Sequence, residues 1–496
     1  MKNVRHTPLV RRIELICLSF TICYVPTLLS LQQYRDSKMY FTERPLAHYS
    51  FVYKTEPATH DRHCTALEAF ALSNKSLDTE CANKYFLFDC KSALLIANSD
   101  APNYAFRDID AFWFDNLENS PGFNADLMLS PRSESYGARI KATRRMGDLL
   151  PIPFFQDTYL AASTGIVSTK NNLIMSTNGA PNSPTTQSNL ALLQQAFDNQ
   201  NWNFMRVKPT PQCRTHVPDI TLIYGSTLID CEHVFLEYNS LVVVPLENSQ
   251  DPKYLFSPYT GPNKHWGVGI NFYLNVPLMD NCQSCVNAWA SLENTFYFRR
   301  AQMRTFDLKY KPYTRYLKVH RKGIVESIPA MNVLTVPCKV KPSDLADLSF
   351  GLTFEANFFS ATIGYNLWTH PTEKIFLRRP CCTADSLKDR YIYPFEAYGV
   401  VAHDNDANKS ATKNSTIKYH ATTADDDLEF TGLTESDLDM FSPAAQTGLL
   451  NTVFATASLH NASRAITVDF GGYYSAPYAN MALKGWGLYA ALRGEF

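Results

Sequence analysis

What this sequence most clearly lacks is a membrane-length apolar segment after its N-terminus. Beyond Leu31, no stretch approaches the roughly 18 consecutive apolar residues at which a transmembrane helix becomes a candidate. The formal net charge is −1, from 46 basic and 47 acidic residues, so the excess of positive charge expected of a general nucleic-acid binder is also missing. If the chain spans a membrane, it must do so with strands.

Signatures of catalysis and of metal binding are missing too. The sequence contains 12 His, but no Gly-x-Ser-x-Gly elbow and no evident Ser/His/Asp spacing. Cys282 and Cys285 form a Cys-x-x-Cys pair without a second pair or a suitably spaced His, which favours a disulfide or free thiols in a short turn over a zinc site. We therefore expect no enzyme, no metal and no cofactor.

The N-terminus has the pattern of a secretory signal. Four basic residues precede an apolar run from Ile13 to Leu31, which Glu14 and Pro26 interrupt. This predicts a signal peptide over residues 1–30, with an uncleaved N-terminal anchor as the alternative. Export implies an oxidising compartment, so the cysteines outside this segment favour disulfides, whose pairing cannot be read from the sequence.

The final stretch, Leu483–Phe496, alternates between an apolar and a polar face. Its apolar positions are Trp486, Leu488, Ala490, Leu492, Gly494 and Phe496, and the interleaved face carries Tyr489, Arg493 and Glu495. A period of two predicts a β-strand. The stretch resembles the closing strand of a Gram-negative outer-membrane β-barrel, in which apolar residues face lipid, polar residues face the lumen and the last residue is commonly Phe. A half-buried edge strand of a soluble sandwich is the alternative.

The same alternation recurs from Phe123 onward. It is clearest at Trp266–Val276 and in the hairpin Leu348–Leu367, which has a very short turn. A first hairpin is predicted at Phe123–Thr143, with its turn at Pro131–Glu134. Counting from Phe123 gives about 12 strands, within a range of about 10 to 16, and closed bacterial barrels have an even number. The predicted fold is an all-β transmembrane antiparallel β-barrel with long extracellular loops.

Three parts follow from this pattern: the signal peptide, residues 31–121, and the barrel over residues 122–496. The mixed pattern of residues 31–121 fits a plug, a periplasmic part or an extra hairpin. With the C-terminus in the periplasm, four long inserts fall on the cell surface: Ser168–Gln212, with a short helix at Ser188–Phe204, then Glu247–His265, Arg300–Asp344 and His370–Gly448.

Two of the predicted loops carry opposite charge. Arg299–Lys322 has nine basic residues and one acid, whereas Ala421–Phe441 is acidic and has no Lys or Arg. We expect the two segments to fold together over the barrel mouth. Cys381 and Cys382 lie in the last external loop and are expected to be oxidised.

Several stretches point to a narrower family. Lys264–Val276, Thr305–Lys318 (TFDLKYKPYTRYLK), Thr362–Ile375 (TIGYNLWTHPTEKI) and the final strand look similar to large barrel proteins of cysteine-rich intracellular bacteria, whose function is largely unassigned. The resemblance covers roughly the C-terminal half and marks the fold without supplying active-site residues. It implies a bacterial outer-membrane location.

The function predicted first is a porin-like channel for passive diffusion of small polar solutes. Its predicted pore-lining residues are Asp126, Arg139, Lys141, Asn271, Glu293, Glu355, Asp469, Arg493 and Glu495. If these charges pair with one another instead, the lumen is narrow, and an N-terminal plug would then indicate a transporter of a specific or hydrophobic substrate. A structural or adhesive surface barrel, cross-linked through its loop cysteines, is the remaining alternative.

The expected partners follow from the location. They are outer-membrane lipid, small polar solutes and the barrel assembly machinery, which would bind through the C-terminal Phe496. No nucleic acid is expected, and the sequence leaves a homo-oligomer open.

Overall fold

The computed structural model describes most of one compact unit, Asp36–Phe496. The described residues are 39–40, 44, 49, 65–77, 80–89, 91–147, 157–180, 183–281, 283–321, 327–342, 344–378, 395, 398–400, 417, 431–461, 465–479 and 483–496. The predicted signal peptide and the acidic run Asp425–Asp427 lie outside them.

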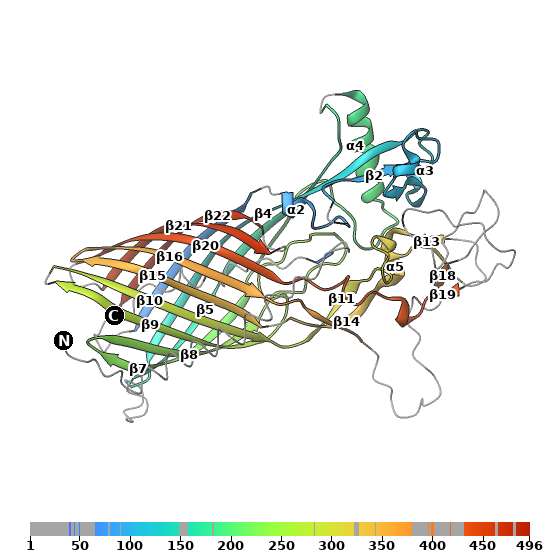
Figure 1. Cartoon of the computed structure of the whole chain (residues 1–496). Helices are drawn as coiled ribbons and strands as arrows, with labels where there is room; N and C mark the ends of the chain where they lie inside the picture. Colours follow the sequence, from blue (N-terminus) through green and yellow to red (C-terminus); the bar gives the residue numbers. More distant parts are fainter. Residues whose placement is uncertain are drawn as a thin grey trace, which may run out of the picture. The chain divides into compact units, whose positions relative to one another are not determined.

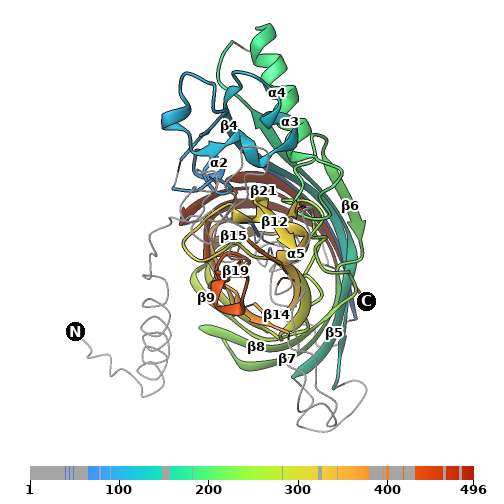
Figure 2. The same ribbon diagram turned by 90° about the vertical axis from the view of Figure 1, so that its right-hand side faces the viewer.

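Twelve strands close into one antiparallel barrel, which Figure 2 shows end on. In order around the ring they are β4 (Asn124–Arg145), β1 (Ala66–Ser76), β22 (Gly485–Glu495), β21 (Ile466–Ala479), β20 (Gly448–His460), β16 (Phe359–His370), β15 (Leu345–Ala356), β10 (Ser284–Tyr297), β9 (Gly267–Asn281), β8 (Val234–Pro245), β7 (Asp219–Cys231) and β5 (Thr158–Ser176). Strand β5 pairs with β4 and closes the ring. The predicted fold class is confirmed.

The barrel exposes apolar side chains on its outside. Ile363 and Leu488 are 60% and 57% exposed, whereas the neighbouring Tyr489 is 5% exposed and faces inward. Leu492 and Arg493 divide in the same way, as the sequence predicted. In a bilayer every backbone polar group must be paired internally, which a closed barrel achieves, and an apolar outer band of this kind is what lipid requires. The closed ring and its apolar outer band are those of a barrel that spans a membrane with strands.

The predicted number of strands agrees with the structure because two errors offset each other: one strand was predicted as two, and another was missed. The predicted turn at Pro131–Glu134 is wrong, because β4 runs through it as a single strand of 22 residues, paired with β5 from Met128 to Arg145. Strand β1, by contrast, lies before the first predicted strand. Its lumen-facing Phe70 and Leu72 are as apolar as its outward Leu67, so alternation is hidden there.

The connections are strongly asymmetric. The turns after β7, β9 and β15 are two residues long, whereas the connections after β5, β8, β10 and β16 leave from the opposite end and are long. This is the arrangement expected with the C-terminus in the periplasm. Among the described residues, no helix is both long and apolar enough to cross a bilayer.

A ribbon projects from the ring where β4 and β5 extend beyond β1 (Figure 1). It carries β2 (Leu94–Ala97), β3 (Ile109–Asp110), β6 (Gln212–His216), α2 (Glu80–Asn83), η3 (Tyr104–Phe106), η4 (Ala111–Trp113), α3 (Asp115–Glu118) and α4 (Pro184–Phe197). The helix expected at Ser188–Phe204 is α4, which begins earlier because Pro184 suits a first helical turn.

The cap is built from the long connections after β10 and β16. One sheet contains β11 (Arg300–Thr305), β14 (Thr335–Lys341) and β17 (Lys374–Leu377); the other contains β12 (Lys318–Arg321), β13 (Ser327–Pro329), β18 (Tyr398–Val400) and β19 (Thr431–Gly432). The short helices η6 (Thr314–Tyr316), α5 (Met331–Leu334) and η8 (Glu435–Asp437) complete it. Figure 1 shows these elements at the long-loop end of the barrel.

The core of the cap is an ion pair inside the basic segment. The Asp307 carboxylate accepts hydrogen bonds from the backbone N–H groups of Tyr313 and Arg315, and lies 2.6 Å from the Arg315 guanidinium. That guanidinium also stacks 4.4 Å from the Tyr313 ring. The Arg315 side chain is completely buried. The sequence TFDLKYKPYTRYLK therefore encodes a buried structural centre.

The basic and the acidic segment meet, although through backbone contacts. Leu308 forms an isolated bridge with Leu438, and the Lys309 N–H donates to the Asp437 carbonyl over 2.9 Å. The acid of the basic segment, Asp307, is paired with its own Arg315. Hydrogen bonding of extended backbone therefore joins these segments in the described part.

The described cysteines lie at different ends of the barrel and can therefore be used to test its orientation. Cys213, Cys231, Cys285 and Cys338 are free thiols, so the expected disulfides would have to involve cysteines outside the described side chains, such as Cys381 and Cys382. Cys213 is exposed on β6 at the long-loop end, and Cys231 is exposed beside a short turn. Cys338 is buried in the cap, and burial raises the pKa of its thiol to about 12.

We expect an impermeant maleimide added to intact cells to label Cys213 but not Cys231. Permeabilising the outer membrane should expose Cys231, while Cys338 should react only after unfolding, because the thiolate is the nucleophile. Peptide mass spectrometry would locate each label. Labelling of Cys231 ahead of Cys213 would invert the orientation.

Candidate functional site

The candidate site is the lumen, which begins near the C-terminus with a cluster of charges. Glu68 on β1 pairs with Arg493 on one neighbouring strand and with Lys141 on the other. Its carboxylate lies 3.5 Å from the Arg493 guanidinium and 3.6 Å from the Lys141 ammonium. Two predicted pore-lining cations thus share one carboxylate that the sequence analysis missed.

The other charged residues of the ring make two kinds of contact. Arg139 lies 2.9 Å from Asp219, with both side chains buried. Asn287 donates to Glu355 over 2.8 Å, and Asn271 donates to Glu293 over 3.4 Å. These contacts join strands of the ring, but only the Arg139–Asp219 contact pairs opposite charges, because the side chains of Asn287 and Asn271 are neutral.

The remaining predicted pore residues lie in different places. Asp469 is 1% exposed on the inner face of β21. Glu495 lies at the end of β22, where it pairs with Ala66. Asp126 is outside the ring: it pairs with Leu95 of β2 on the ribbon and accepts a hydrogen bond from Asn178. The strand through Asp126 extends past the barrel, which the predicted hairpin did not allow for.

The middle of the lumen is aromatic. One buried cluster contains Tyr49, Phe70, Leu72, Val167, Trp289, Phe454, Tyr473, Tyr489 and Ala491, with Tyr273 packed against it. A second contains Leu241, Val243, Tyr297, Leu345, Trp368 and Leu450. These side chains come from strands all around the ring. The lumen therefore holds a packed core where a polar pore was expected.

Tyr473 and Tyr489 lie flat against the wall because glycines face them. Tyr489 pairs with Gly471, and Tyr473 pairs with Gly487. A Cβ on Gly471 would lie 2.2 Å from the Tyr489 ring, and one on Gly487 would lie 2.4 Å from the Tyr473 ring. The reciprocal placement of rings over glycines turns the inner surface of β21 and β22 into an apolar wall.

Described residues that precede β1 in the sequence lie against the lumen wall and the cap. The Tyr49 ring is 5.0 Å from the Tyr473 ring, within the aromatic cluster. The Arg44 guanidinium stacks 4.4 Å from the Tyr49 ring. We call Met39, Tyr40, Arg44 and Tyr49, the described residues of this part of the chain, the plug segment; all four are buried.

Arg44 ties the plug segment to the wall. Its guanidinium forms an ion pair with Asp347 of β15 and donates a 2.7 Å hydrogen bond to Asn366 of β16. The side chains of Arg44 and Asp347 are 1% and 2% exposed. Asn366 also donates to Ser349 and to Asp347, so the ion pair lies within a network of side-chain hydrogen bonds. Removing either residue of a buried ion pair leaves the other charge buried without compensation, which is strongly destabilising.

Tyr40 extends the plug segment to the cap. Its hydroxyl accepts a 2.9 Å hydrogen bond from the Thr305 N–H, and the Arg304 guanidinium lies 4.1 Å from its ring. Burial raises the pKa of Tyr40 to about 12, so this hydroxyl is protonated at physiological pH. The plug segment is thus held at three points, by the aromatic cluster, by Asp347 and by the cap.

Sequence signals for this site were weak. Arg44 and Tyr49 lie in the segment for which a plug was one of three interpretations, and alternation does not reveal what a residue contacts across the lumen. Asp347 lies two residues before Ser349, so the alternation of the predicted strand at Leu348–Ala356 does place its side chain on the inward face. Its partner is 303 residues away.

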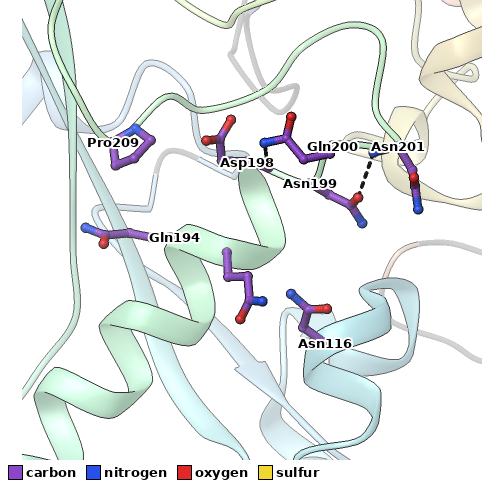
Figure 3. Close-up of a pocket in the computed structure, with 8 residues that line it drawn as sticks. Asn116, Gln194, Asp198, Asn199, Gln200, Asn201 and Pro209 are labelled. Atoms are coloured by element: carbon purple, nitrogen blue, oxygen red, sulfur yellow. Dashed lines mark hydrogen bonds between the residues drawn. The ribbon is translucent and has the colours of Figure 1, made fainter.

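A polar hollow of about 500 Å³ lies on the ribbon (Figure 3). Carboxamides line most of it: Asn116, Gln194, Gln195, Asn199, Gln200 and Asn201, together with Asp198 and Pro209. Asp198 is neutralised by Arg206 at 2.6 Å. Within the described part of the chain, no three His, Cys, Asp or Glu side chains are grouped as metal ligands.

Comparisons with known proteins add only fold-level likeness. No family model and no curated protein matches the sequence. Among solved structures, an outer-membrane channel from Pseudomonas putida F1 aligns over 89% of this chain and 100% of its own, with 7% identity and a TM-score of 0.39. A FadL homologue from Pseudomonas aeruginosa aligns over 88% and 90%, with 7% identity and a TM-score of 0.28. The translocator domain of an autotransporter from Neisseria meningitidis aligns over 88% and 90%, with 7% identity and a TM-score of 0.26.

Proposed function

We propose that this protein is a gated outer-membrane channel, closed by the plug segment and opened when that segment leaves the lumen. The observation that carries the proposal is the buried contact of Arg44 with Asp347 and Asn366. Transport is the class of function, with passive diffusion through a permanently open porin as the alternative. We also propose that this protein is related to the large barrel proteins of cysteine-rich intracellular bacteria.

The lining of the lumen indicates the kind of substrate. Trp289, Phe454 and Tyr473 form an aromatic wall, while the lumen cations are engaged with carboxylates. An aromatic path favours small solutes that contain an apolar or aromatic part, because such solutes lose little solvation there. Freely hydrated ions are disfavoured by the same surface.

The proposed partners are those of an outer-membrane barrel. Lipid contacts the apolar band, and the barrel assembly machinery is proposed to bind through Phe496, whose side chain is 78% exposed. The backbone of Phe496 pairs with Thr65 just before β1, so its side chain is free to engage a partner while its strand remains in the ring.

Single-channel recording of the refolded full chain tests the gate. We expect the unchanged protein to be closed for most of the recording and Arg44→Gln to raise the open probability at least about tenfold, since 1.4 kcal/mol already gives that ratio. The physical reason is that Arg44→Gln leaves the Asp347 carboxylate buried and uncompensated while the plug segment is in place, whereas water can solvate it once the lumen opens.

Lys75→Gln is the matched control. Lys75 also pairs with a carboxylate, Glu134 at 3.3 Å, but its side chain is 56% exposed, so removing this charge should leave gating unchanged. Heat-modifiable migration would establish that each variant is folded. Steady ohmic conductance of the unchanged protein would refute the gate and favour the passive porin.

A further inference from the structure

The sheet β11–β14–β17 continues the barrel wall beyond the ring. Strands β10, β15 and β16 are neighbours in the barrel, and the chain leaves or enters each of them through β11, β14 and β17, which pair in the same order. The outer surface of the sheet is therefore an extension of the lipid-facing surface at the long-loop end.

The two faces of this sheet differ. The inner face buries Gln302, Arg304 and Cys338, and Arg304 covers Tyr40 of the plug segment. The opposite face, which points away from the lumen axis, exposes Met303 and Phe376 at 36% and 47%. On that face Lys339 is exposed and pairs with Phe376 in the register.

Cations without an ion-pair partner among the described residues lie on this outer face or at its edges. The stretches 296–304, 335–341 and 374–378 contain no acidic residue. Six of their basic residues form no ion pair with any described residue: Arg299, Arg300, Lys339, Lys341, Lys374 and Arg378. The acid next in sequence, Glu373, is engaged by Arg304, 3.2 Å away.

Aromatic side chains mark the level of the bilayer surface beneath these cations. The Lys341 ammonium lies 5.0 Å from the centre of the Phe296 ring, and Phe296 packs edge-on against Phe298. Trp266, 47% exposed, accepts a backbone hydrogen bond from Phe298. Aromatic girdles lie at the interface of membrane barrels, so the cations lie at the depth of the lipid headgroups.

We propose that the outer face of β11–β14–β17 binds the phosphorylated headgroup of an outer-leaflet glycolipid. The occupant follows from continuity with the lipid-facing wall and from charge: apolar side chains receive acyl chains, and Lys339, Lys374 and Arg378 lie where headgroup phosphates would be. A phosphate monoester carries more charge than a phosphodiester, so a cluster without acids favours monoesters.

Native mass spectrometry of the refolded full chain tests the binding. The probes are bisphosphorylated lipid A, phosphatidylglycerol and phosphatidylcholine, each titrated in neutral detergent. We expect affinity to fall in that order. An interfacial cation contributes about fivefold to the binding of anionic lipid, so the double variant Lys339→Gln/Lys374→Gln should bind lipid A roughly 25-fold more weakly. Raising the salt should weaken binding by the unchanged protein.

The matched control is Lys75→Gln/Lys170→Gln, which also removes two cations from the outside of the barrel. Both of these cations lie beside Glu134, at 3.3 and 3.8 Å, and should add little to lipid binding. Equal weakening by the two double variants would overturn the site, as would unchanged binding by Lys339→Gln/Lys374→Gln. Equal affinity for phosphatidylglycerol and lipid A would overturn the preference for monoesters.

Discussion

Asp307→Ala is expected to unfold the cap while the barrel stays folded. The variant leaves the Arg315 guanidinium completely buried without its carboxylate, and breaking a buried pair in this way costs about 3–5 kcal/mol. Two backbone N–H groups also lose their acceptor, at Tyr313 and Arg315. The barrel does not depend on this centre, because its strands pair with one another around the ring.

Limited proteolysis in detergent would measure the effect. Cleavage within residues 300–341 should become at least about a hundredfold faster, whereas heat-modifiable migration should be unchanged. Lys309→Ala, in the same loop, removes an exposed side chain and should change little. The double variant Asp307→Leu/Arg315→Met should recover part of the loss, since an apolar pair leaves no buried charge. A protease-resistant cap in Asp307→Ala would contradict the prediction.

Ile363→Arg should impair insertion, whereas Thr362→Arg should not. Ile363 is 60% exposed in the middle of β16, on the lipid-facing side, where a cation costs about 2–4 kcal/mol. Thr362 is the adjacent residue and faces the lumen, where its hydroxyl lies 2.9 Å from that of Thr353. A cation there can reach water along the lumen.

Folding yield in lipid vesicles, read from heat-modifiable migration, compares the two variants. The yield of Ile363→Arg should rise in thinner bilayers, since the arginine can then reach the interface. Equal yields for both variants would mean that alternate residues of β16 do not face lipid and lumen in turn.

Alternation predicted the strands that face lipid on one side and a polar lumen on the other. It worked for Trp266–Val276 and for the final strand, because burial and polarity agree there. It failed at β1, where the lumen itself is apolar, so that Phe70 and Leu67 look alike in sequence while facing opposite ways. At β4, Pro131 and the residues after it have the composition of a turn, so a turn was predicted there. The sequence does not show that this stretch pairs with β5, which keeps it extended.

The candidate site was harder to predict than the fold. Inward charges such as Arg139 and Lys141 followed from parity, but their partners Asp219 and Glu68 are distant in sequence, and pairing arises only when the ring closes. The position of Arg44 could not be predicted for the same reason, because its contacts with Asp347 and Asn366 span more than 300 residues.

The pairing of β1 with β22 has a consequence for assembly. Ser73 and Leu488 bond across 415 residues, so the seam between β1 and β22 can form only once both strands are present. Contacts this remote are slow to form because loop closure opposes them. The described plug residues precede β1 in the sequence. If the proposed gate is correct, a barrel that closes its seam with Arg44 and Tyr49 already at the lumen wall is shut from the moment it forms.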